Sequence, residues 1–578
     1  MLLQMRRWAV SFLVLGSLLV RTVAVAAPPA PVLDGPLTTE ADTAAMIDLE
    51  TKINDSMQQG HVVEINFRTA EQIPGDVEST WSWGDSGEWT GVYAGGEAMR
   101  YAVAKARLQA KGPRGKAAAG DRRFWKAQRD EALSRIETML AAQHREINIA
   151  EDWQGSLKVP PDVNSDPIEK RHAANFGGGI IRGERGMLLR TCTPEGLGRL
   201  GINEPTVDEQ EPVNNNSNRV YKITSHEDGI TYNCETSPSR DTYAGVTFGL
   251  LLMFDLVGPD EPELRDQIRT DLVSMGDFLL KYGWNYPRPH GYVAAYPFQN
   301  DFDGFISPFM GHVPMARLNM TNAVRHVVNN GGSAADRQKW NAVWAEELAT
   351  QGPVLGLSME VDNLENYEPY YKFNLHHLNA FNLLRTTTGA ARDVLARGFA
   401  VEDKTTRDDI NAHFEAITYA LTGEQWRLDA AVTHLREWLQ YRARVSTGEL
   451  ILNSPRCDLP PDDPEHLDCL PQDEYQVHTP AGPVSYRPGQ PDADPVSESP
   501  GRKAASPLPV ADRPPWDFLW QRGPTLLDGL DWGGGSGQAR SWRMPGIDFL
   551  TPYWMIRYFT EVAPPVEQPF PEWIGFAH

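Results

Sequence analysis

The sequence predicts a mainly helical protein built from antiparallel pairs of helices, with a few short strands. Apolar residues recur at helical spacing through most of the chain, as at Leu133, Ile136, Met139 and Leu140. Short breaks such as Gly331-Gly332-Ser333 separate consecutive helical segments, and short connections favour antiparallel hairpins. Few segments alternate apolar and polar residues as strands do, so a large sheet domain is not expected.

These patterns predict eleven helices and three regions of short strand. The helices are expected at residues 39–58, 87–111, 121–149, 242–256, 260–283, 310–329, 334–351, 372–388, 405–422, 424–446 and 546–562. Strands are expected near residues 61–66, 179–191 and 219–233, where β-branched and apolar residues cluster. This number of paired helices is close to that of a ring of six helical hairpins, the (α/α)6 toroid.

Residues 1–26 are expected to be a secretory signal peptide. Arg6 and Arg7 precede an uncharged apolar run, Trp8–Val20, and Ala24-Val25-Ala26 supplies a small-x-small cleavage site. A membrane anchor is disfavoured, because the run is shorter than the roughly 20 residues that cross a bilayer. The sequence therefore predicts a secreted or periplasmic protein, cut after the last of these alanines, with no membrane anchor.

The mature chain, residues 27–578, is expected to form one large toroidal domain, with two domains as the alternative. Residues 150–240 carry few helix signals and are expected to be an insertion with small strands. Residues 452–515 are rich in Pro, Asp and Ser and are expected to form a long loop. The formal net charge of −23 repels phosphate backbones and anionic membranes, so nucleic acid is not an expected partner.

The four cysteines are expected to form disulfides, because their number is even and the predicted compartment is oxidising. Proximity along the chain favours Cys192 with Cys234 and Cys457 with Cys469, among three possible pairings. A zinc site is the alternative, but no CxxC or HxxxH spacing supports it.

The first candidate site is the segment Trp81–Tyr93, which leads into the second expected helix. Its aromatic rings can stack on sugar rings, and its carboxylates can accept hydroxyl hydrogen bonds or move protons. Asp85 is a candidate catalytic residue, and Trp83, Glu88 and Trp89 are candidate substrate-binding residues. The alternative is structural: Asp85 caps the helix, Glu88 interacts with the helix dipole, and the tryptophans belong to the core.

The second candidate site opens the next expected helix after the insertion. Asp241 is a candidate catalytic residue, or alternatively an N-cap and nothing more, and Arg240 and Tyr243 are candidate substrate-binding residues. Gly245 and Gly249 share one helix face, where missing side chains allow either a neighbouring helix or a ligand to approach closely.

The third candidate site lies in residues 365–379, around the start of another expected helix. Tyr371 and Asn379 are candidate substrate-binding residues. His376 is a candidate proton carrier because imidazole titrates near neutral pH, and the alternative is a structural histidine with satisfied hydrogen bonds.

Other chemical templates fail. No GxSxG elbow, P-loop, GxGxxG before a helix or HExxH occurs, so no cofactor is expected. Asn300–Gly304 resembles part of a calcium loop but lacks the remaining ligands, so it is interpreted as a turn and no metal is expected. In residues 513–522, aromatic residues alternate with charged ones. This segment is interpreted either as the rim of a pocket or as a tail that packs over the helices.

With these residues, the chain resembles secreted six-hairpin toroid enzymes that act on carbohydrates, such as the unsaturated glucuronyl hydrolases and related glycosidases. The resemblance covers most of residues 39–562 and depends on the helix count, the aromatic-rich helix starts, and the carboxylates Asp85 and Asp241. It implies an (α/α)6 toroid with a pocket at one end of the inner helices, where Asp residues perform acid–base chemistry.

The resemblance favours hydrolysis of an oligo- or polysaccharide, with Asp85 and Asp241 as the acid and base in either order. Arg240, Trp89 and Tyr243 are then expected to orient the sugar.

Two alternatives stay open. A polysaccharide lyase would use Tyr371 or His376 as the base next to a uronate carboxylate, with Asn379, Arg182 and Arg190 available to neutralise it. A non-catalytic glycan-binding or envelope protein would instead keep the two candidate carboxylates apart or packed as helix caps.

Overall fold

The computed structural model describes most of the chain between residues 36 and 571. The described ranges are 36–69, 71–110, 119–153, 156–158, 180–202, 220–235, 238–282, 284, 286–287, 293–294, 312–359, 371–407, 409–446, 475–479, 482–486, 520, 542–565 and 568–571. The expected signal peptide, the Asn300–Gly304 turn, the Cys457 and Cys469 pair and most of residues 513–522 lie outside these described residues.

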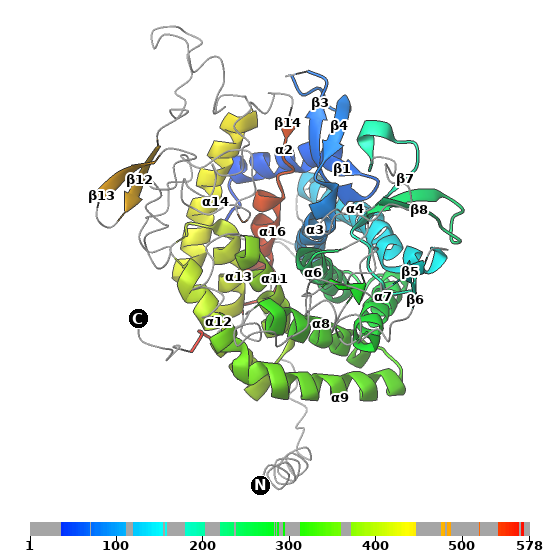
Figure 1. Ribbon diagram of the computed structural model, residues 1–578. Coiled ribbons are helices and arrows are strands. Elements are labelled where there is room, and N and C mark those ends of the chain that lie inside the picture. The colour runs from blue at the N-terminus through cyan, green and yellow to red at the C-terminus, as the bar shows by residue number, and fades with distance from the viewer. Residues whose placement is uncertain are drawn as a thin grey trace, which may run out of the picture.

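Helices dominate the described part of the chain, with short antiparallel sheets at its periphery (Figure 1). The α-helices in it are α2 (Glu40–Ser56), α3 (Ser86–Gln109), α4 (Ala119–Asn148), α6 (Arg240–Leu256), α7 (Pro262–Lys281), α8 (His312–Asn329), α9 (Ala334–Gln351), α11 (Tyr371–Thr386), α12 (Gly389–Thr406), α13 (Ala412–Thr422), α14 (Gln425–Ser446) and α16 (Ile547–Glu561). The sequence-based prediction of a mainly helical chain is therefore confirmed.

One stretch of helix differs from the prediction. The helix expected at 405–422 is α13, which begins only at Ala412, and the preceding α12 was not predicted. Helical structure is interrupted between them at Ile410, whose φ of 52° lies in the left-handed region. Asn411 then caps α13, because its side chain accepts hydrogen bonds from the backbone of His413 and Phe414. The polar residues before Ala412 were thus interpreted as a first turn, although they form a break.

The strands are short and pair in antiparallel fashion. They are β1 (Met57–Gln58) with β2 (His61–Val62), β3 (Glu64–Phe67) between β4 (Val77–Trp81) and β14 (Trp542–Arg543), β5 (Ser156–Lys158) with β6 (Ile180–Arg182), β9 (Thr231–Glu235) between β7 (Thr191–Pro194) and β8 (Val220–Thr224), β10 (Tyr286–Pro287) with β11 (Val293–Ala294), and β12 (Tyr475–Thr479) with β13 (Gly482–Tyr486). Strands β5 to β9 fall within the expected insertion at 150–240.

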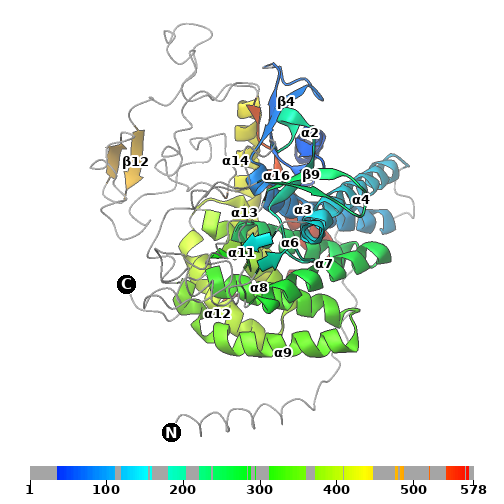
Figure 2. The same ribbon diagram turned by 45° about the vertical axis from the view of Figure 1, so that its right-hand side comes forward.

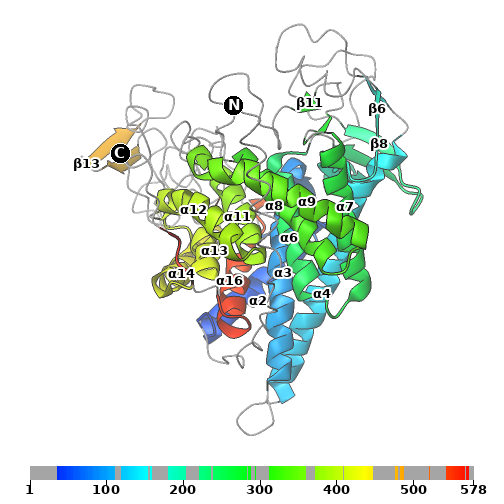
Figure 3. The same cartoon turned by 90° about the horizontal axis from the view of Figure 1, so that it is seen from below.

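Helices adjacent in sequence pack as pairs. Contacts join α3 with α4, α6 with α7, α8 with α9, α11 with α12, and α13 with α14, while the terminal helices α2 and α16 contact each other. One helix of each pair also contacts a helix of the next pair. Helix α3 contacts α6, α6 contacts α8, α8 contacts α11, α11 contacts α13, α13 contacts α16, and α16 contacts α3. In addition, α6 contacts α11. Figures 2 and 3 show the molecule in turned views, with α3 beside α4 in both. A single apolar core includes side chains from all of these helices.

Glycines bring α3 and α6 into unusually close contact. A Cβ on Gly91 would lie 2.0 Å from the carbonyl oxygen of Gly245, and a Cβ on Gly249 would lie 2.5 Å from the carbonyl oxygen of Gly91. One turn earlier, Gly87 meets Thr242. Because later residues of α3 meet later residues of α6, the two helices run parallel, and both begin at the same end of the contact. The close approach that the sequence left open is therefore made by a neighbouring helix.

Candidate functional site

The start of α3 presents Asp85 without using it as a helix cap. Asp85 occupies the N-cap position, yet its side chain makes no capping hydrogen bond. Instead, Nη2 of Arg190 lies 3.0 Å from its Oδ1, and the Nε of Arg190 donates to the carbonyl oxygen of Gly84. The Asp85 side chain is 34% exposed, so its charge is both neutralised by a guanidinium and reachable from solvent.

The start of α6 presents Asp241 in a similar way. Ser239 is the N-cap of this helix and forms a capping box with Thr242, so Asp241 is not the cap. Asp241 is half-buried. Its enclosure by protein, reinforced by the charge of Asp85 and opposed by Arg240, raises its pKa to about 6. Asp85 therefore lies close enough to Asp241 to raise the pKa of Asp241.

Glu88 lies in the first turn of α3, three residues after Asp85. It is only 6% exposed, and Nδ2 of Asn374 donates a hydrogen bond to its Oε1 at 2.6 Å. Burial raises the pKa of Glu88 well above its usual range, and the negative charges of Asp241 and Asp85 raise this pKa further. Glu88 therefore keeps its proton to a higher pH than an ordinary carboxyl group does, and in that form it is a neutral hydrogen-bonding group.

Helix α11 contributes Tyr371 and Asn374, which are three residues apart and share one helix face. Tyr371 is half-buried, and burial together with the charge of Asp241 raises its pKa. Behind Asn374, the second residue of α13 adds a further contact, because Nε2 of His413 lies 3.1 Å from Oδ1 of Asn374. The first turns of α3, α6, α11 and α13 thus all contribute to one cluster of polar side chains.

We call this cluster the carboxylate site: Asp85, Glu88, Arg190, Asp241, Tyr371, Asn374 and His413. It holds three acids in three environments: one paired with a guanidinium, one half-buried with a raised pKa, and one buried with a pKa raised well above its usual range. Carboxyl groups whose environments separate their pKa values are suited to act as an acid and a base in one reaction. The site can therefore donate one proton and accept another without a cofactor.

The other candidate residues of the α3 segment are packed in the protein interior. Trp83 lies in a small apolar cluster with Val63, Ile65, Phe67 and Ile202, and its Nε1 donates to Thr80. Trp89 is buried in the main core. Trp81, at the end of β4, is 58% exposed and is the accessible tryptophan of this segment.

Of the remaining candidate residues, some lie near the two aspartates and others are packed in the protein interior. Arg240 lies beside Asp241, whose pKa it lowers, whereas Tyr243 is buried in the core. His376 faces α12, where its Nδ1 lies 3.1 Å from Oε1 of the buried Glu402. Asn379 accepts a hydrogen bond from Asn319 of α8 at 2.6 Å. Of the residues expected on α11, Tyr371 interacts electrostatically with the two aspartates.

Two members of the carboxylate site were not singled out from the sequence. Asn374 follows Tyr371 by three residues, and that spacing was a usable signal for a shared face. His413 follows the unpredicted break at Ile410, so its position at the start of α13 was not evident. Arg190 was considered only as a partner for a uronate, whereas here it binds Asp85.

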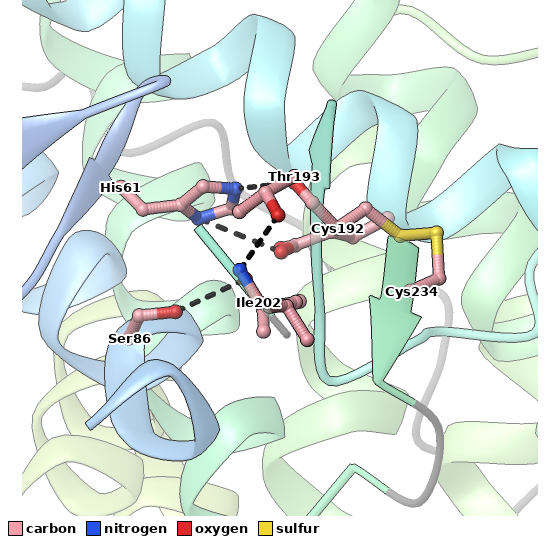
Figure 4. The surroundings of a disulfide bond; sticks show 8 residues. His61, Ser86, Cys192, Thr193, Ile202 and Cys234 are labelled. Atoms are coloured by element: carbon pink, nitrogen blue, oxygen red, sulfur yellow. Dashed lines mark hydrogen bonds and ion pairs between the residues drawn. A yellow bond between two sulfur atoms is a disulfide. The ribbon is translucent and has the colours of Figure 1, made fainter. Parts of the chain in front are cut away.

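A disulfide joins Cys192 to Cys234 (Figure 4), and Cys192 follows Arg190 by two residues in the chain. The two cysteines are directly opposite each other on β7 and β9, as proximity along the chain had suggested. Just before β7, the backbone N–H of Arg190 donates to the carbonyl oxygen of Glu235 at 2.9 Å. The covalent link therefore fixes the strand pair immediately beside Arg190.

Comparisons with known proteins give no relative for this chain: no family model, no curated protein and no solved structure matches it. Within the described residues, no three His, Cys, Asp or Glu side chains are grouped so that they could hold a metal ion. In the same residues, none of the helices combines the length and apolar character that a membrane crossing requires.

Proposed function

We propose that this protein is a secreted glycoside hydrolase that cleaves an oligo- or polysaccharide by carboxylate acid–base catalysis. The observation that carries the proposal is the pair Asp85 and Asp241. Both are accessible in part, both lie at the start of adjacent parallel helices, and each has a different electrostatic partner. Neither side chain serves as a helix cap, which is the role that a purely structural interpretation would give it.

Asp241 is the proposed general acid. With a pKa of about 6 it carries a proton in mildly acidic solution, and it can transfer that proton to the leaving glycosidic oxygen. Asp85 is the proposed general base, because Nη2 of Arg190 pairs with its Oδ1 and partial exposure lets water reach it. In an inverting reaction the two carboxyl groups stand roughly 6.5–9.5 Å apart, with water between the base and the sugar.

The helix contacts support a six-hairpin toroid as the framework of this site. In such a ring one helix of each hairpin lies inside and its partner outside. The observed contacts follow that order, from α3 through α6, α8, α11, α13 and α16 back to α3. The carboxylate site takes its residues from the first turns of four of these proposed inner helices, in agreement with a pocket at one end of the ring.

The Cys192–Cys234 disulfide supports an extracellular or periplasmic location, since disulfides persist in oxidising compartments. The acidic net charge is compatible with a neutral carbohydrate as substrate and unfavourable for nucleic acid. We therefore propose export by the N-terminal signal peptide and action on a carbohydrate outside the cytoplasm.

The test is a screen of the purified protein against a panel of polysaccharides, reading new reducing ends and unsaturated products separately. On any substrate that is cleaved, Asp85→Asn and Asp241→Asn are each expected to lower the rate roughly 10²–10⁴-fold. The matched control is Asp48→Asn, which removes an exposed carboxylate on α2 and is expected to leave the rate unchanged.

Three results would contradict the proposal. Unsaturated products would indicate a lyase and a role for Tyr371 as the base. Binding of a glycan with no cleavage would indicate a non-catalytic protein. Full activity in both asparagine variants would exclude the assigned acid and base, whatever the substrate.

A further inference from the structure

A row of buried side chains leads from α13 through α11 to α3. Nε2 of His413 lies 3.1 Å from Oδ1 of Asn374, and Nδ2 of Asn374 lies 2.6 Å from Oε1 of Glu88. All three residues are buried. Because an unsatisfied buried polar group is costly, the direction of each hydrogen bond in such a row is constrained by its neighbours.

The direction at the histidine end follows from its charge state. Burial, together with the nearby His377, lowers the pKa of His413 to about 3, so its ring is neutral and carries a single N–H. An amide oxygen can only accept a hydrogen bond, so that proton must be on Nε2. The Nδ1 atom has no hydrogen-bond partner among the described residues. The centroid of the His413 ring lies 4.6 Å from that of the Trp520 ring.

The direction at the glutamate end follows from the amide. With its oxygen held by His413, Asn374 presents its NH₂ group to Glu88, so Oε1 of Glu88 accepts. A carboxylic acid has one carbonyl-type oxygen and one hydroxyl oxygen. When Oε1 accepts from Asn374, the proton of Glu88 is on Oε2.

We infer that His413 and Asn374 are positioning residues, which together direct the proton of the neutral Glu88 carboxyl group to Oε2 and so set the hydrogen-bonding character of this carboxyl group in the carboxylate site. Glu88 is faced by Asp85 before α3, Asp241 on α6, Arg190 before β7 and Asn374 on α11. A proton that stays on one oxygen can be donated to a group bound in the carboxylate site. A proton that moves between the two oxygens would let either oxygen act as donor or acceptor. The inference depends on the proposed function only in assigning Glu88 to an active site.

The experiment uses infrared difference spectroscopy on the full-length protein without substrate. The carbonyl stretch of a protonated carboxylic acid is separate from the amide bands, and subtracting the Glu88→Gln spectrum isolates the Glu88 signal. The pH dependence of that signal gives the proton affinity of Glu88, and its frequency reports the hydrogen bond accepted by Oε1. Neither quantity requires a known substrate, so the result is independent of the polysaccharide screen.

Asn374→Leu removes the N–H donor at similar side-chain volume. The Glu88 carbonyl stretch is expected to move to higher frequency, and its proton affinity is expected to rise roughly twofold to tenfold, because the lost hydrogen bond stabilised the ionised form. His413→Gln keeps an N–H donor for Asn374 and is expected to retain the wild-type signal. His413→Phe leaves the amide free to turn and is expected to shift the signal.

Two outcomes would overturn the inference. A fall in proton affinity in Asn374→Leu would mean that Asn374 accepts a proton from Glu88, with the amide reversed. An unchanged Glu88 signal in Asn374→Leu would mean that the row does not control the proton at all. If His413→Phe fails to fold, the Asn374→Leu measurement alone still decides between these results.

Discussion

Gly91 of α3 and Gly245 of α6 touch backbone to backbone, because a Cβ on Gly91 would lie 2.0 Å from the Gly245 carbonyl oxygen. This contact brings the starts of the two helices side by side, one carrying Asp85 and the other Asp241. We expect Gly91→Ala to push the helices apart and lower the free energy of unfolding by about 1–3 kcal/mol or more. Chemical denaturation followed by circular dichroism measures the change.

Gly96→Ala on the same helix is the matched control. A Cβ there would lie 3.1 Å from the side-chain oxygen and 3.2 Å from the Cα of Thr551, contacts that a shift of a few tenths of an ångström relieves. Alanine also has the higher helix propensity, by about 1 kcal/mol. We expect Gly96→Ala to cost clearly less than Gly91→Ala, and equal costs for the two would argue against a special backbone contact at Gly91.

The helices could be predicted from the sequence because their information is local. Apolar spacing and breaks such as Gly331-Gly332-Ser333 are visible in any short window. The missed boundary before α13 depends on a left-handed Ile410, a conformation that β-branched residues rarely adopt and that no local pattern indicated. The order in which helices contact one another is non-local, so the sequence suggested a count of helices but not their neighbours.

The ion pair between Arg190 and Asp85 also has a measurable consequence. Arg190 lowers the pKa values of both Asp241 and Glu88, so Arg190→Gln is expected to raise them. If Asp241 is the general acid, the rate falls as the pH rises through its pKa of about 6, and this limb of the pH–rate profile is expected to move to higher pH in the variant. The measurement is the pH–rate profile on a substrate from the panel.

Arg199→Gln provides the control for Arg190. Arg199 pairs with Glu78 at 3.3 Å on the surface, where its side chain is 77% exposed. Its removal is expected to leave the profile in place, because exposed ion pairs contribute little. A profile unchanged in Arg190→Gln as well would contradict the assignment of Asp241 as the acid.

The sequence identified part of the carboxylate site and left out the rest for a physical reason. Asp85 and Asp241 were noticed because each opens a helix, which is a local signal. Asn374 and His413 matter through contacts between α3, α11 and α13, which no spacing in the sequence reveals. Trp89, in contrast, was considered a sugar platform, yet its large apolar surface is buried in the core.

The Cys192–Cys234 disulfide is expected to stabilise the fold and hold Arg190 in place. It closes a loop of sequence separation 42, for which the chain-entropy relation gives about 4 kcal/mol. The double variant Cys192→Ala/Cys234→Ala is therefore expected to lose roughly 2–5 kcal/mol of unfolding free energy. Equilibrium denaturation measures the loss, and an unfolding free energy equal to that of the native protein would contradict the prediction.

The buried pair His61 and Glu146 predicts a weakening of the fold at alkaline pH. Their side chains approach to 3.5 Å, but both are neutral near pH 7. Burial and Arg145 lower the pKa of His61 to about 3, and burial raises the pKa of Glu146 to about 8. The folded state therefore keeps a proton on Glu146 that the unfolded chain releases near its ordinary pKa of 4.5, so the contribution of Glu146 to stability falls as the pH rises from about 4.5 to about 8. The lowered pKa of His61 has the opposite effect up to its ordinary pKa of 6.5, so the pair together weakens the fold between about pH 6.5 and 8.

Glu146→Gln keeps the shape of the neutral acid and cannot ionise. We expect its unfolding free energy to exceed that of the native protein by ~2–4 kcal/mol above about pH 8, with the difference shrinking toward pH 4.5. The control is Glu137→Gln, an exposed position on the same helix, for which no pH-dependent difference is expected. Denaturation across this pH range measures both, and a Glu146→Gln difference that stays constant with pH would show that Glu146 is already ionised in the folded protein.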